Sequence, residues 1–152
     1  MSEGSGSATS CFPKRGGTHY ILGSDALTNT GHVPVTIDSV HLVGASNLVQ
    51  TGAFVSPVPS HGPSTIMGNV TGMPWAFYAK GQRALWQNKV PAENAVVPPT
   101  SLGTDLNVLV ATRAPEPSKD STARIEVDCH ASGSAAVWHS IVIYRAVPGR
   151  SC

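Results

Sequence analysis

Residues 33–42 carry the strongest constraint on the fold, because their side chains alternate in the way that a β-strand requires. Pro34 stands near the start of this segment, where a missing backbone N–H is tolerated. Just before it, Asn29-Thr30-Gly31-His32 contains Asn and Gly, which accept the backbone angles of tight turns. The stretch 27–44 therefore predicts a structural hairpin. On strict alternation, Val33, Val35, Ile37, Ser39 and His41 share one face, and Pro34, Thr36, Asp38, Val40 and Leu42 share the other.

Similar strand-like patterns recur along the chain, with turn residues between them. No segment has a convincing helical period. The chain is therefore predicted to be all-β and to form a single antiparallel β-sandwich of about seven strands. Besides residues 33–42, the expected strands lie at 18–29, 48–55, 106–112, 123–130 and 136–147.

Two segments stand apart from this pattern. Residues 1–17 are rich in Gly and Ser and are expected to form a flexible N-terminal segment, so that the sandwich spans 18–152. Residues 57–104 combine many prolines with aromatic residues and show no clear period. They are expected to form an elaborated loop, with one short strand at 75–80.

Composition excludes several kinds of partner. Charged residues make up only 12% of the chain and the net charge is +1, so no general attraction to nucleic acid is expected. No apolar run is long enough to cross a bilayer, so no transmembrane segment is expected. Residues 1–11 lack the basic and apolar regions of an export signal. The low charge and the strand-dense pattern nevertheless favour an extracytoplasmic protein, secreted or associated with the cell envelope.

The last two expected strands can be paired in a definite register. If residues 133–135 form a three-residue loop, Val127 faces Ile141 and Ile125 faces Ile143 on one apolar face. A two-residue loop would mix charged residues into that face. Because a slip of one residue turns every side chain over, the three-residue loop is the predicted arrangement.

This register leaves Trp138, Val142 and Tyr144 on the outer face of the hairpin. The favoured interpretation is that the 57–104 excursion covers most of this surface, since large apolar patches are seldom exposed. The alternative is an exposed aromatic stripe, extended by Trp75 and Trp86 from the excursion. These five residues are the candidate partner-binding set.

Three stretches resemble immunoglobulin-like β-sandwich domains of exported bacterial proteins, in particular small actinobacterial domains of unknown function. They are LTNTGHVPVTIDSV at 27–40, WQNKVPAENAVVPP at 86–99 and RIEVDCHASGSAAVWHSIVIYRAV at 124–147. The resemblance covers most of residues 18–147. It implies an immunoglobulin-like sandwich, but no active site, because such sandwiches serve in adhesion, assembly and ligand binding alike.

Three cysteines bear on the compartment. Cys11 and Cys152 bracket the domain and would form a disulfide if both ends of the chain lie at one end of the sandwich, which suits an oxidising compartment. Cys129 falls on the apolar face and is expected to be a small core residue. A Cys11–Cys129 disulfide and a lipid anchor on Cys11 are the alternatives.

Six histidines raise the question of a metal site. His61, Met67 and Met73 lie in the excursion and would suit copper, which accepts imidazole and thioether ligands. No paired spacing supports this set, so the primary prediction has no metal and no cofactor.

Nothing in the sequence indicates catalysis. Asp38 and His41 are three residues apart and would point to opposite faces of a strand. Asp128 and His130 share a face but lie about 6 to 7 Å apart along the strand. The predicted function is therefore a non-enzymatic binding or assembly module that recognises a protein or a surface glycan. A copper-handling protein is the alternative.

Overall fold

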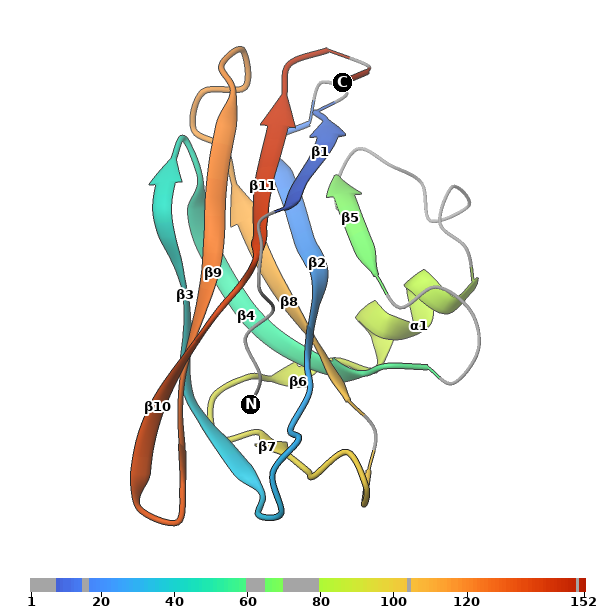
Figure 1. Cartoon of the computed structure of the whole chain (residues 1–152). Helices are drawn as coiled ribbons and strands as arrows, with labels where there is room; N and C mark the ends of the chain where they lie inside the picture. Colours follow the sequence, from blue (N-terminus) through green and yellow to red (C-terminus); the bar gives the residue numbers. More distant parts are fainter. Residues whose placement is uncertain (1–7, 15–16, 60–64, 70–79, 104, 150) are drawn as a thin grey trace.

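Two β-sheets pack face to face to form a sandwich (Figure 1). The computed structural model describes residues 8–14, 17–59, 65–69, 80–103, 105–149 and 151–152. The sandwich confirms the predicted fold class, with more strands than the seven expected. The strands are β1 (Ala8–Pro13), β2 (His19–Leu27), β3 (Val35–Ser46), β4 (Val49–Pro57), β5 (Ile66–Asn69), β6 (Val90–Pro91), β7 (Val96–Val97), β8 (Leu106–Arg113), β9 (Ser121–Ala131), β10 (Ser134–His139) and β11 (Val142–Val147), and the helix is α1 (Lys80–Gln87).

The six-stranded sheet has the order β1-β11-β9-β3-β7, with β10 also paired to β9. The five-stranded sheet has the order β5-β2-β8-β4-β6. The pairs of named strands are antiparallel except β1 and β11, which run parallel. Strand β9 pairs with β3, β10 and β11 and so forms the centre of its sheet.

The main core fills the space between the two sheets. Cys129 belongs to it, as expected, and is 1% exposed. The alternate residues of β9 from Ala123 to Cys129 all face this core, which confirms the predicted face of that strand. Other members of the core are Tyr20, Leu22, Ile37, Val40, Val108, Val110 and Tyr144.

The stretch 27–44 is not a hairpin: residues 28–34 link β2 to β3, which begins at Val35. Strand β2 belongs to the five-stranded sheet and β3 to the six-stranded one, so the chain crosses between the layers here. Asn29 stabilises the crossing: its side-chain oxygen accepts a hydrogen bond from the Gly31 N–H, and its Nδ2 donates to the carbonyls of Val33 and Val97. An Asn side chain that hydrogen-bonds the backbone of its own turn stabilises that turn, as the strand-to-strand hydrogen bonds of a hairpin would.

A β-bulge in β3 corrects the predicted faces of that strand. The register against β9 shifts between Ile37 and Ser39, and one extra residue is accommodated there. Ile37 and Val40 therefore both face the core, while Ser39 and His41 point outward. The strict alternation placed His41 beside Ile37, which is wrong.

The β9–β10 hairpin also differs from its prediction. Its loop is the two-residue turn Ser132-Gly133, and both residues have positive φ, at 49° and 81°. This is the arrangement that the right-handed twist of paired strands favours. Trp138 then lies opposite Val127, and the outer face predicted for Trp138 and Tyr144 is wrong.

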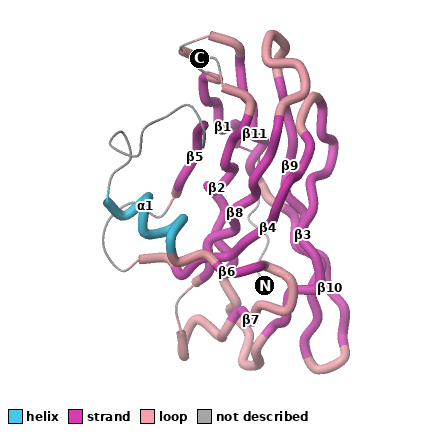
Figure 2. Tube along the Cα trace, turned by 180° about the vertical axis from the view of Figure 1, so that it is seen from behind, coloured by secondary structure: helices cyan, strands magenta, loops and turns pink. Residues whose placement is uncertain are grey.

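The described part of the 57–104 excursion adds β5 and β6 to the edges of the five-stranded sheet and β7 to the six-stranded sheet, and none of these strands pairs with β10 or β11. Helix α1 lies against β4 and β5 (Figures 1 and 2). Beneath it, Leu85 joins Ile21, Ile66 and Leu109 in a second hydrophobic cluster. The helix has only eight residues, fewer than the window over which a helical period is recognised, which is why it was not expected.

The predicted flexible segment 1–17 contains strand β1, so the sandwich begins before residue 18. Pairing with β11 and a disulfide between Cys11 and Cys152 hold this strand in place, which confirms the predicted bridge. The side chain of Lys14 is buried, and its ammonium donates to the carbonyls of Glu116 and Lys119. The described residues contain no helix that is long and apolar enough to span a bilayer.

Candidate functional site

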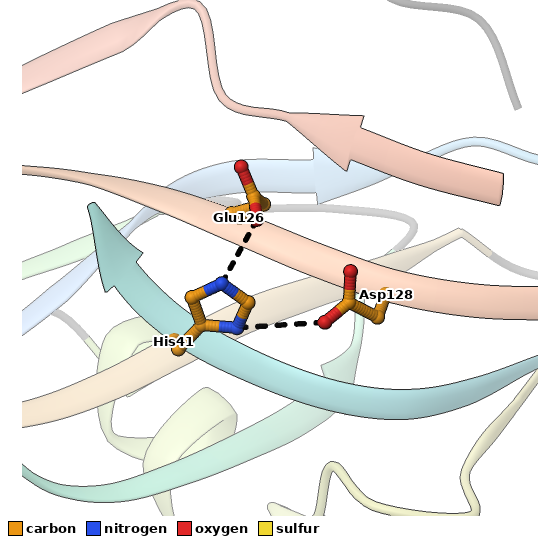
Figure 3. Close-up of side chains that lie close together, drawn as sticks. All are labelled: His41, Glu126 and Asp128. Carbon is orange, nitrogen blue, oxygen red and sulfur yellow. Dashed lines mark hydrogen bonds and ion pairs between the residues drawn. The ribbon is translucent and has the colours of Figure 1, made fainter.

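Three adjacent strands place a row of titratable side chains on the outer face of the six-stranded sheet. His41 of β3 lies directly opposite Glu126 of β9, and Glu126 lies directly opposite His139 of β10. Asp128 points outward one step further along β9 (Figure 3). We refer to His41, Glu126, Asp128 and His139 as the His–carboxylate row.

The central carboxylate is held between two imidazoles. His41 Nε2 lies 2.9 Å from Glu126 Oε1, and His139 Nδ1 lies 3.0 Å from Glu126 Oε2. The other nitrogen of His41, Nδ1, faces Asp128 Oδ2 at 3.7 Å (Figure 3). One imidazole thus lies between two carboxylates, and one carboxylate lies between two imidazoles.

Neighbouring side chains extend this arrangement. Ser39 donates a hydrogen bond to Asp128 Oδ2 over 2.8 Å. Further along the face, His130 Nδ1 lies 2.7 Å from Asp38 Oδ1. Three carboxylates therefore gather on one face, together with three imidazoles.

The row is accessible to solvent without being fully exposed. The side chain of Glu126 is 20% exposed, whereas those of His41 and Asp128 are about twice as accessible. Arg124, the next outward residue of β9, is the nearest fixed positive charge along that strand. With neutral imidazoles, Asp38, Glu126 and Asp128 outweigh it, so the face is locally negative.

Two local features of the sequence create the row. The bulge in β3 turns Ser39 and His41 to the outer face, where strict alternation would have placed Val40 and Leu42. The two-residue turn of the β9–β10 hairpin sets His139 opposite Glu126. The predicted outward face of β9 is confirmed, whereas His41 and His139 were predicted on apolar faces and instead lie beside it.

This arrangement is suited to holding a cation. Imidazole nitrogen and carboxylate oxygen are metal ligands of the kind that zinc accepts. The Ser39 hydroxyl donates to a carboxylate and not to His41, so the imidazole is not placed to remove its proton.

A pocket of about 420 Å³ lies beside the β9–β10 hairpin. His130, Cys129 and Trp138 form part of its wall. Strand β10 has an edge here: within the described residues it pairs with β9 and with no other strand. We refer to the side of β10 that faces away from β9 as the β10 edge. The remaining lining residues are Val35, Ala131 and residues 134–137.

The structure separates the residues predicted to bind a partner. Trp138 is 7% exposed and Tyr144 is fully buried, so they form no exposed stripe. Val142 is half-buried at the margin of the main core. Trp86 lies on the other side of the molecule, where its ring packs against Phe54. Trp75 lies outside the described residues.

The alternative copper-binding residues are not among the side chains that the structure describes. His61 and Met73 lie outside the described residues, as does the side chain of Met67 in β5. This set therefore remains a prediction.

A buried polar cluster connects the two sheets and was not expected from the sequence. Asp25 of β2 is 4% exposed and accepts hydrogen bonds from Ser140 (2.7 Å) and Tyr144 (2.5 Å). The Tyr144 oxygen in turn accepts a bond from the Ser24 N–H. Burial raises the pKa of Asp25, although the bonds from Tyr144 and Ser140 oppose this. Burial and the neighbouring Asp25 carboxylate raise the pKa of Tyr144 well above its ordinary value.

Comparison with protein-family models, with curated proteins and with solved structures finds no match to this chain. The fold and the side-chain geometry are therefore the basis for assigning a class. They define a β-sandwich protein with a His–carboxylate row on one sheet and, in the part of the chain that the structure describes, a strand β10 that is paired on one side only.

Proposed function

We propose that the protein is a non-enzymatic, extracytoplasmic binding or assembly module that holds an extended segment of a partner protein along the β10 edge. The observation that carries this proposal is the edge itself, which lies beside an apolar pocket. An unpaired strand edge offers a row of backbone donors and acceptors to an incoming strand. Pockets for alternate side chains then supply specificity.

The hairpin register indicates which groups face the partner. Residues that flank a two-residue turn form a hydrogen-bonded pair, and such pairs alternate with pairs that are not hydrogen-bonded. Counting from Ser134, Ala135 and Val137 belong to the second kind, so their N–H and C=O groups point away from β9. These two residues would bond the added strand.

The neighbouring strand supports this binding mode. The Ala8 N–H donates to the Ile141 carbonyl, and β1 then continues alongside β11. The sheet therefore already accepts a parallel strand on this side, immediately beyond the end of β10. A partner segment would extend the same line.

The pocket has room for an apolar side chain of that segment. Its volume, about 420 Å³, lies within the usual range for ligand sites. Val35 and Ala136 supply apolar walls. The indole of Trp138 would act as a rigid wall, a role different from that of an exposed anchor.

Strand order supports an immunoglobulin-like classification. In such domains one sheet contains strands C, F and G, and the other contains B, E and D. Here β3, β9 and β10–β11 adjoin in the first order, and β2, β8 and β4 in the second. Strand β1 departs from the constant-type pattern, because it joins the last strand and not β2. The Cys11–Cys152 disulfide supports an oxidising compartment.

The test uses a library of displayed random peptides selected on the purified oxidised protein. Peptides that bind should be extended and should lose affinity at least tenfold with Val137→Pro, which removes an outward N–H that the fold does not use. Val137→Thr keeps the N–H and the branched side chain, so it is the matched control and should bind as the wild type does.

Two results would contradict the proposal. One is peptide binding that Val137→Pro leaves unchanged. The other is selective binding in a parallel glycan array, which would make a carbohydrate the partner. Residues 1–7 precede Ala8 at this edge, so binding is also measured on a chain that begins at Ala8. Binding that appears only there would make the protein's own N-terminal segment the occupant.

A further inference from the structure

The geometry points to a divalent transition-metal site on the outer face of the six-stranded sheet, with His41, Glu126 and Asp128 as its ligands. In this arrangement His139 and Ser39 are positioning residues that hold the two carboxylates. The site is independent of the β10 edge, and it differs in both residues and ligand type from the copper set expected in the excursion.

The spacing of the ligand atoms supports the site. One atom from each of His41, Glu126 and Asp128 lies within 4.8 Å of the other two. In a tetrahedral zinc site with bonds near 2.0 to 2.1 Å, ligand atoms stand about 3.3 Å apart. His41 Nε2 lies 2.9 Å from Glu126 Oε1, and the opposite ring nitrogen, Nδ1, lies 3.7 Å from Asp128 Oδ2. Only one of these nitrogens can bind a given ion, so the imidazole must turn out from between the two carboxylates before all three side chains converge on it.

Contacts from neighbouring side chains to the two carboxylates also support the site. Carboxylates that bind metals are themselves hydrogen-bonded, which fixes their orientation. Glu126 has an ion-pair contact of this kind, because His139 Nδ1 lies 3.0 Å from its second oxygen. Asp128 has one too, from the Ser39 hydroxyl at 2.8 Å. In an isolated surface ion pair, no further side chain needs to hold the carboxylate.

The backbone makes the site rigid. Both carboxylates come from β9, which is paired on both sides, and His41 comes from the adjacent β3. The Cα positions of the ligands are therefore fixed by ladder pairing in the centre of a sheet. Binding requires no loop to become ordered, so little conformational entropy would be lost.

Charge and ligand type select the metal. Two carboxylates, with Asp38 nearby, attract a cation to this face. The imidazole favours zinc and its neighbours over Mg²⁺ and Ca²⁺, which prefer oxygen ligands alone. Three protein ligands leave one position for water or for a group from another molecule. Zn²⁺ is therefore the appropriate probe.

The experiment is a calorimetric titration of the full, untagged and metal-free oxidised chain with Zn²⁺. We expect one ion per chain. Glu126→Gln and Asp128→Asn should each weaken binding at least 100-fold, and so should His41→Gln. The positioning variants His139→Gln and Ser39→Ala should weaken it about 10-fold to 100-fold. Mg²⁺ should give no measurable binding.

His130→Gln is the matched control. His130 is an exposed imidazole on the same face of β9, but it contacts Asp38 and not the ligands. The His130→Gln variant should leave the Zn²⁺ affinity unchanged. All the altered side chains face solvent, and circular dichroism of each variant checks that the fold is intact.

A second measurement locates the ion. Co²⁺ in place of Zn²⁺ should give the visible spectrum of a nitrogen and oxygen site, without thiolate bands from Cys129. Zn²⁺ binding that survives Glu126→Gln and Asp128→Asn would overturn the site. An equal loss with His130→Gln, or a thiolate spectrum, would also overturn it.

Discussion

Tyr144 reaches across the interior of the sandwich and donates a hydrogen bond to Asp25 over 2.5 Å. The tyrosine comes from β11 of the six-stranded sheet and the aspartate from β2 of the five-stranded sheet. This bond therefore connects the two layers through a polar contact inside an apolar core.

Removing the tyrosine hydroxyl should destabilise the fold. Tyr144→Phe leaves Asp25 with the Ser140 bond and takes away the acceptor of the Ser24 N–H. Because a buried group left without its partner costs about 1 to 3 kcal/mol, the free energy of unfolding in urea should fall by about that amount. An unchanged value would show that water replaces the hydroxyl.

The pH dependence of stability should reveal Asp25. Burial raises its pKa from the ordinary 3.8, so the folded protein holds this proton more tightly than the unfolded chain. The stabilisation from this group is fully present below about pH 3.8 and is lost as the pH rises through the folded pKa. Asp25→Asn has no such proton. The free energy of unfolding of the wild type should therefore decline relative to that of Asp25→Asn over this window. If the free energies of unfolding of the two proteins changed in parallel with pH, this would contradict the raised pKa of Asp25.

Loss of the terminal disulfide should be costly. The bridge between Cys11 and Cys152 closes a loop with a sequence separation of 141 residues. In the chain-entropy model a loop of this length contributes about 5 kcal/mol, so the Cys11→Ser/Cys152→Ser variant should unfold at markedly lower denaturant concentration. Reductant should weaken the wild type and leave the double variant unchanged, because Cys129 carries a free thiol.

Trp138→Ala should act mainly on folding. The indole is 7% exposed and belongs to the main core, so its truncation should cost about 3 to 5 kcal/mol. Val142→Ala, at a half-buried position nearby, should cost less and serves as the comparison. A change of under about 1 kcal/mol for Trp138→Ala, measured by urea unfolding, would mean that the indole is not a core residue.

Much of the fold could be predicted from the sequence, because strands carry a local signature. The alternation in β9 and the apolar run of β8 identified these strands and the core face of Cys129. The paired termini followed from where Cys11 and Cys152 stand in the chain. Local side-chain patterns are sufficient for conclusions of this kind.

The candidate site could not be predicted because it depends on register between strands. A single extra residue in β3 turns His41 outward, and no residue type near Ile37 marks that bulge. The position of His139 depends on a turn one residue shorter than expected. Two small shifts of register thus decide which side chains meet around Glu126, and such shifts are fixed by packing across the whole sheet.

The covalent bridge has a mechanical consequence. Figure 1 shows the C-terminus near the arrowhead end of β1, the strand that contains Cys11, so traction applied at Ala8 and Cys152 meets the sulfur–sulfur bond early. Only residues 8–10 of β1 precede Cys11 and could peel away from β11. Beyond that point the disulfide carries the pulling force, and the two sheets do not. The surfaces at the β9–β10 end would therefore keep their shape under a force that would separate the sheets of a sandwich without the disulfide.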